Sequence, residues 1–171
     1  MRLRAEAEAT TERALRLAGV TRLDAEAVQY FSGFCFIGLA GYTALIRDGE
    51  KMTPDAKKLN GIKTRAIIGD KFFSYLNEVG RLDPQAAAHA VLAIAGRQQE
   101  CVRDLNRGPD FMDGDTRLKF FPSNMAAGPC ARARSLERKL VEPNSAPLVP
   151  FEDCSHADQC GCRYLMKRYN W

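Results

Sequence analysis

The segment from Val28 to Ile46 constrains the fold most, because its nineteen residues include no charged side chain. An apolar stretch of that length either fills the centre of a helical domain or spans a bilayer. Its polar residues, its three glycines and the mixed charges on both sides of it favour a buried central helix. The alternative interpretation is a membrane-associated protein anchored by residues 28–46.

Start and stop residues around this segment predict four helices joined by short loops. A first helix is expected over residues 5–18, and the third is expected to run from Thr53 to Gly80. The residues that begin or end helices are Gly19, the Thr21/Asp24 pair that resembles a capping box, Gly49, Thr53-Pro54-Asp55, Gly80 and Asp83-Pro84. The sequence therefore predicts a mainly α fold, with a four-helix bundle-like part over residues 1–107.

Residues 108–171 are expected to form a small, irregular module packed on this bundle. Arg117–Phe121 alternates basic and apolar side chains, which is typical of a short strand and leaves room for one β-hairpin. A short helix is expected to follow Pro129-Cys130, and the proline-rich segment 143–150 is expected to be extended.

Four of the six cysteines lie in this module, at Cys130, Cys154, Cys160 and Cys162, with the spacing C-x23-C-x5-C-x-C. Zinc in structural sites commonly takes four thiolate ligands. Cys160 and Cys162 face the same way if their segment is extended, and Cys154 can return to that face across the turn between them. The pattern predicts a structural zinc site at these four residues, with His156 as an alternate ligand.

Packed free thiols, a disulfide and a catalytic cysteine are the competing interpretations of the same residues. The first residues do not follow the pattern of a secretory leader, which favours the cytoplasm, where thiols stay reduced. Cys35 and Cys101 fall on apolar helix faces, so we expect both to be buried.

The net positive charge of the chain is concentrated in residues 116–171 of this module. Residues 116–171 hold nine basic and five acidic residues, which accounts for the whole formal charge of +4. Arginine and aromatic residues together are typical of protein interfaces and also of single-stranded nucleic-acid sites. The candidate partner-binding residues are Arg132, Arg134, Arg163, Tyr164, Lys167, Arg168, Tyr169 and Trp171.

The expected partner is another protein or a second copy of the chain, with nucleic acid and a membrane as alternatives. None of the common phosphate-binding or nucleophile motifs is present in the sequence. These observations favour a non-enzymatic binding or adaptor protein, and a thiol enzyme is the alternative from another class.

The residues of the tail also carry a resemblance. Pro129-Cys130, the run Ala146-Pro147 to Pro150, Asp153-Cys154 and Cys160-Gly161-Cys162-Arg163-Tyr164 resemble a C-terminal cysteine module of uncharacterised bacterial proteins, with the pattern A-P-x-x-P-x-x-x-C followed by C-x-C-x-Y. The resemblance covers less than a third of the chain. It implies a bacterial, cytosolic setting and a compact module, and it implies no activity.

Overall fold

The computed structural model describes residues 2–107, 117–125 and 128–167. The chain divides into two compact units, Met1–Gly96 and Arg97–Trp171. The division falls inside the long helix α7 (Pro84–Arg107), whereas the sequence placed it at residue 107. The two units are described separately below.

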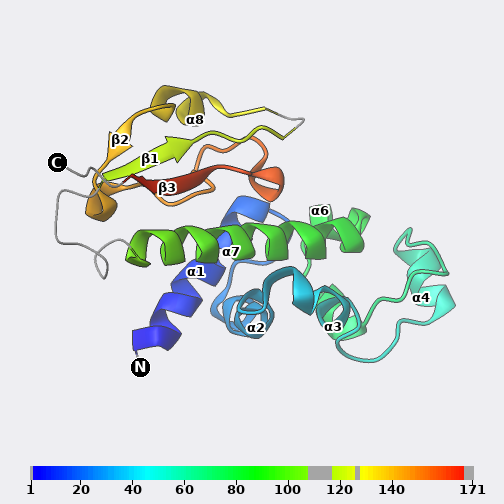
Figure 1. Cartoon of the computed structure of the whole chain (residues 1–171). Helices are drawn as coiled ribbons and strands as arrows, with labels where there is room; N and C mark the ends of the chain where they lie inside the picture. Colours follow the sequence, from blue (N-terminus) through cyan, green and yellow to red (C-terminus); the bar gives the residue numbers. More distant parts are fainter. Residues whose placement is uncertain (1, 108–116, 126–127, 168–171) are drawn as a thin grey trace. The chain divides into compact units, whose positions relative to one another are not determined.

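The described residues of the first unit form helices and two isolated β-bridges, which confirms the mainly α prediction (Figure 1). Its helices are α1 (Arg2–Ala18), α2 (Ala25–Cys35), the 3-10 helix η1 (Gly38–Gly41), α3 (Tyr42–Ile46), α4 (Pro54–Leu59), α5 (Asp70–Ser74), α6 (Glu78–Leu82) and the first part of α7. Its core holds apolar side chains from most of these elements, including Leu15, Phe31, Leu45, Ile68, Phe72, Leu76 and Leu92.

Side-chain caps begin several of the helices, as the sequence predicted. The Thr53 hydroxyl accepts a hydrogen bond from the amide of Ala56 at 3.2 Å, and Pro54 is the first residue of α4. The Asp83 carboxylate caps α7 by accepting from the amide of Ala86 at 3.0 Å. The capping box expected at Thr21 is wrong, because Asp24 itself is the cap of α2 and accepts from Ala27 at 2.8 Å.

The uncharged segment does not form one helix. It breaks after Cys35 and resumes at Gly38, and the axis bends by 104° between the two halves. Gly38 has a φ of 57°, in the left-handed region that a glycine adopts without steric cost. The single continuous helix expected here is therefore replaced by α2, η1 and α3.

The helix predicted from Thr53 to Gly80 is also wrong, since α4 ends at Leu59 and two short helices, α5 and α6, follow later. The chain after α4 forms a loop that is anchored to the buried Lys57. The Lys57 amine donates a hydrogen bond to the carbonyl of Thr64 at 3.2 Å. Gly69 then pairs with Lys51 in an isolated antiparallel bridge. These contacts outside the helix override the helical spacing of the apolar residues.

The second unit contains a three-stranded antiparallel sheet with the strand order β2-β1-β3 (Figure 1). Its strands are β1 (Arg117–Phe121), β2 (Leu140–Val141) and β3 (Arg163–Lys167), and its helical elements are the end of α7, α8 (Ala131–Leu136), η3 (Pro143–Ser145) and η4 (Ala157–Gln159). The strand predicted at Arg117–Phe121 is confirmed. The helix predicted over residues 131–140 already ends at Leu136, because Arg138 adopts a φ of 63° and the chain turns into β2.

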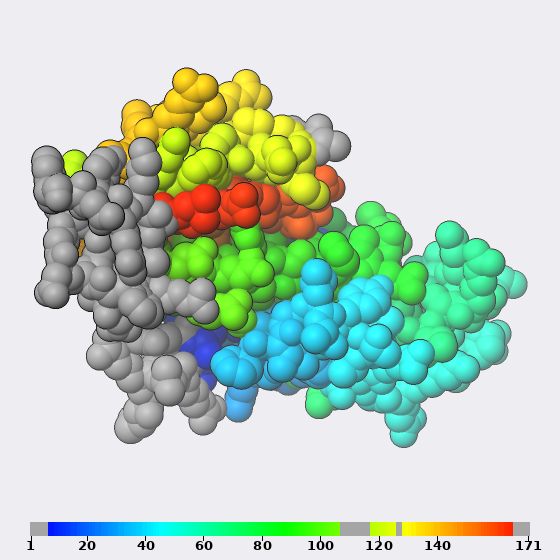
Figure 2. Space-filling model, viewed as in Figure 1, coloured from blue at the N-terminus to red at the C-terminus, as the bar shows by residue number. Residues whose placement is uncertain are grey.

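Alternation along the strands builds the core of this unit. Phe120 and Tyr164 are paired across β1 and β3, and their rings meet edge to face with centroids 5.3 Å apart. Arg163 and Leu165, on the other face of β3, are exposed, and the strand is visible as a red band on the surface in Figure 2. The buried core consists of Cys101, Leu118, Phe120, Ala133, Val149, Phe151, Cys162 and Tyr164.

Candidate metal centre

Four cysteines of the second unit line one small cavity. The residues around it are Ser123, Gly128, Cys130, Cys154, His156, Gln159, Cys160 and Cys162. The enclosed space is about 10 Å³, on the order of the room that one water molecule needs. An organic ligand requires at least thirty times more, so the cavity suits a single ion or water.

Four separate local structures bring the cysteines to this cavity. Cys130 is the residue immediately before α8, and Cys154 closes a turn in which its amide donates to the carbonyl of Phe151 at 3.1 Å. Cys160 ends η4, and Cys162 directly precedes β3. The turn between Cys154 and Cys160 returns the chain to the same place, as the spacing predicted.

Hydrogen bonds to sulfur favour the thiolate form of Cys162. The thiol of Cys160 donates to Cys162, and the backbone amide of Ser123 donates to the same sulfur at 3.3 Å. The bond from Cys160, aided by that from Ser123, lowers the pKa of Cys162 below its ordinary value. The same bond, together with burial, raises the pKa of the donor, Cys160.

Cys154 and Cys130 belong to the same electrostatic cluster. Burial is the main cause that raises the pKa of Cys154 to about 12, and the neighbouring sulfurs of Cys160 and Cys130 raise it further. The sulfur of Cys130 also acts on Cys162. With no ion present, Cys162 is the favoured thiolate, while Cys154 and Cys160 hold their protons, because negative charges in one small space repel each other.

Ser123, Gly161 and Arg97 hold the loop that carries the cysteines. The Ser123 hydroxyl accepts hydrogen bonds from the amides of Met125 and Gly161, each at 3.2 Å. A side chain at Gly161 would place its first carbon 2.9 Å from that hydroxyl, so the approach requires glycine. The Arg97 guanidinium donates to the carbonyl of Cys162. Sequence reasoning missed these three residues, although a glycine between two candidate ligands is itself a clue.

The donor set fits a soft divalent cation. All six cysteines lie among the described residues, and none of them forms a disulfide. Within the described part of the chain, no three His, Cys, Asp or Glu side chains already stand at the spacing of an assembled metal centre. Four thiols around an ion-sized space match the ligands that zinc takes in structural sites, and binding would displace their protons.

His156 lies at the cavity, whereas Cys35 and Cys101 are buried elsewhere. His156 lines the cavity, where its backbone amide bonds to Cys154, while its imidazole Nδ1 lies 2.9 Å from the Ser155 hydroxyl. Cys35 and Cys101 are 1% and 3% exposed, which confirms that they are buried.

The candidate partner-binding residues do not form one surface. Tyr164 lies in the core, where its hydroxyl donates to the carbonyl of Pro147 at 2.8 Å. Arg132, Arg134 and Arg163 are exposed. Lys167 ends β3, and Arg168, Tyr169 and Trp171 lie outside the described residues.

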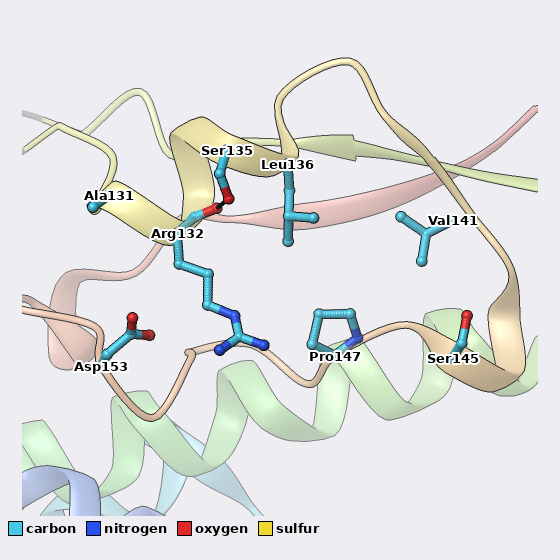
Figure 3. Close-up of a pocket in the computed structure, with 8 residues that line it drawn as sticks. All are labelled: Ala131, Arg132, Ser135, Leu136, Val141, Ser145, Pro147 and Asp153. Atoms are coloured by element: carbon cyan, nitrogen blue, oxygen red, sulfur yellow. Dashed lines mark hydrogen bonds between the residues drawn. The ribbon is translucent and has the colours of Figure 1, made fainter.

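An open groove of about 680 Å³ lies beside α8 in this unit (Figure 3). Arg132 reaches into it from α8, and its guanidinium lies over the Phe151 ring, 5.5 Å from the ring centre. The other residues that line the groove are Ala131, Ser135, Leu136, Val141, Ser145, Pro147 and Asp153. Its mixture of apolar and polar side chains around one arginine is typical of a peptide-binding surface.

Among the described residues, no single helix is both long and apolar enough to cross a membrane, and α2 with the segment Gly38–Ile46 passes that test only as a pair bent by 104°. Comparison with protein-family models, with curated proteins and with solved structures finds no match for this chain.

Proposed function

We propose that the chain is a non-enzymatic binding protein whose second unit is held together by zinc at Cys130, Cys154, Cys160 and Cys162. The observation that carries the proposal is the convergence of these four thiols on one ion-sized cavity. Three of them come from a nine-residue segment and the fourth from the start of α8, so an ion would join two distant parts of the module.

A structural role fits the site better than a catalytic one. Four cysteine ligands complete a tetrahedron and leave no open position for a substrate, as in structural zinc sites generally. Cys162 is 2% exposed, so a substrate has little access to the sulfur whose ionised form is favoured. The site also requires reduced thiols, in agreement with the cytoplasmic localisation expected from the sequence.

Metal analysis of the purified full chain tests this proposal directly. We expect about one zinc per chain, with the four clustered thiols protected from a thiol reagent until a chelator is added. Cys35 and Cys101 are protected by burial instead and react only after denaturation. No metal with six thiols after denaturation would overturn the zinc proposal, and one fast-reacting thiol in that metal-free protein would favour the thiol enzyme.

The binding role rests on the groove beside α8. Among the described residues, Arg132 forms no ion pair. Residues 116–171, which include Arg132, carry a net formal charge of +4. A guanidinium beside an apolar wall can donate two parallel hydrogen bonds to a carboxylate. We therefore propose a protein partner that places an acidic side chain of an extended segment against Arg132.

A charge-reversal pair tests the groove. Arg132→Glu should abolish capture of a partner that the wild-type, metal-loaded chain retains, while Arg138→Glu should leave capture intact. Arg138 is a matched control because it is exposed, belongs to the same module and does not line the groove. Equal loss in both variants would indicate a general effect of charge and would exclude the groove as the binding site.

A further inference from the structure

A further cavity, of about 350 Å³, lies in the first unit and is lined by three cationic side chains. Arg47 follows α3, and Lys63 and Arg65 lie on the loop between α4 and α5. The rest of the wall consists of Ile46, Ala66, Ile67 and Gln85. No acidic side chain lines this cavity, and its size is that of a small-ligand pocket.

The positive charge of the pocket is not compensated locally. Among the described residues, no ion pair involves Arg47, Lys63 or Arg65. The sequence from residue 56 to residue 69 contains four basic residues and no acidic one. In Figure 2 this turquoise part of the first unit is open to solvent, so an anion can approach it freely.

The loop is held in place from beneath by a buried lysine. Lys57 is 2% exposed, and its amine has one acceptor, the carbonyl of Thr64, which lies between Lys63 and Arg65 in the chain. The amide of Ala66 donates to the carbonyl of Lys63 at 2.9 Å, which turns the loop. The two neighbouring cations are therefore presented by a structured loop with a further basic group under it.

We propose that this pocket binds the phosphate group of a small phosphorylated molecule. Two guanidinium groups and an ammonium group match the three oxygens of a phosphate, since arginine binds phosphate through paired hydrogen bonds and lysine as a point charge. The apolar wall of Ile46, Ala66 and Ile67 suits the organic part of the ligand. Gln85, on the first turn of α7, adds a neutral hydrogen-bonding group at the rim.

Phenyl phosphate is a suitable probe, because it combines a phosphate with a compact apolar ring. We would titrate it into the full-length protein and follow backbone amides by NMR, with inorganic phosphate and phenol in parallel. We expect phenyl phosphate to bind saturably with a Kd below about 10 mM, and more tightly than either inorganic phosphate or phenol. The shifts should be confined to residues 46–47, 63–67 and 85.

Two variants and a matched control complete the test. Lys63→Ala and Arg65→Ala should each weaken phenyl phosphate binding by about tenfold or more. Lys58→Ala removes an exposed lysine of α4 that does not line the pocket and should change the affinity less than about twofold.

Absence of saturation with phenyl phosphate would overturn the proposal, as would an equal loss of affinity in Lys58→Ala. A single-stranded RNA and an anionic vesicle serve as competitors for the same charges. Tighter binding of either, with shifts spread beyond the pocket, would replace the small-ligand proposal by an electrostatic surface for that macromolecule. None of these outcomes depends on the metal content of the second unit.

Discussion

The backbone amide of Ser123 donates a hydrogen bond to the sulfur of Cys162 at 3.3 Å, across 39 positions of sequence. The hydroxyl of the same serine accepts from the amide of Gly161. Ser123 therefore helps to favour the thiolate form of Cys162 and also holds the segment that carries Cys160 and Cys162. Amide-to-sulfur bonds of this kind orient metal ligands and stabilise the thiolate form that binds the ion.

Cys160→Ser should release the zinc and loosen the second unit. Serine is a poor zinc ligand, and the binding free energy of a structural zinc is folding free energy. We expect less than about 0.2 zinc per chain and a loss of several kcal/mol from the second unit, measured by metal analysis and chelator-dependent thermal unfolding.

Cys35→Ala is the matched control for that variant. It removes a thiol that is 1% exposed but lies in the first unit. It should keep the full zinc content and cost about 1 kcal/mol. A Cys160→Ser protein that retains one tightly bound zinc would show that Cys160 is not a ligand.

Gly161→Ala should destabilise the second unit by about 1–3 kcal/mol, because the added methyl group meets the Ser123 hydroxyl. Ser123→Ala should cost about 1–2 kcal/mol through the loss of its two accepted hydrogen bonds. Urea unfolding of the single and double variants at saturating zinc measures the coupling.

The double variant, Gly161→Ala with Ser123→Ala, shows whether Gly161→Ala acts through a clash with the Ser123 hydroxyl or through a general loss of order. Alanine at position 123 has no hydroxyl, so Gly161→Ala should cost less in that background than in the wild type. Strictly additive losses would mean that the two residues do not interact.

Tyr164→Phe should lower the free energy of unfolding by about 1 kcal/mol near neutral pH, since the bond to the Pro147 carbonyl is lost. Burial, with smaller effects from Cys101 and Cys162, raises the pKa of Tyr164 above its ordinary 10.0. Below pH 10 the tyrosine is protonated in both the folded and the unfolded state, so it adds no pH dependence there.

Above pH 10 only the unfolded state loses the proton, and the stability that Tyr164 contributes therefore falls as pH rises. Denaturant unfolding at pH 8 to 11 should show a smaller alkaline loss for Tyr164→Phe than for the wild type. Parallel losses in both proteins would show that Tyr164 ionises equally easily when folded.

Lys57 should stabilise the first unit mainly through its hydrocarbon stem. Lys57→Ala leaves a cavity and should cost about 2 kcal/mol, whereas Lys57→Met refills the space and should change stability by less than about 1 kcal/mol. The Thr64 carbonyl left without its donor belongs to an exposed residue and can bond to water. Equal losses in the two variants, measured by urea unfolding, would assign the stabilisation to the amine.

Local chemistry made the helix starts predictable. Thr53-Pro54 and Asp83-Pro84 satisfy free amide groups within one turn, so nothing distant can change their effect. Helix lengths were less predictable. The uncharged segment breaks because Gly38 adopts a left-handed conformation. Residues 60–69 leave the helix because the Lys57 amine bonds to the Thr64 carbonyl and Gly69 pairs with Lys51.

The candidate ligands of the metal centre were predictable from the sequence, but the residues that hold those ligands in place were not. Cysteines are rare enough that a cluster of four draws attention even across 23 intervening residues. Ser123 and Arg97 are common residue types, distant in sequence from Cys162, and only the fold reveals that they bond to it. Tyr164, expected at a binding surface, is instead a core residue because its strand alternates.

The helix α7 continues without interruption past Gly96 into the second unit. An expression fragment that starts at residue 108 would retain all four clustered cysteines. It would nevertheless lack Cys101 from the buried core and the Arg97 guanidinium that holds the Cys162 carbonyl. Anyone who dissects this protein into separately produced pieces should therefore begin the C-terminal piece within the helix, before Arg97.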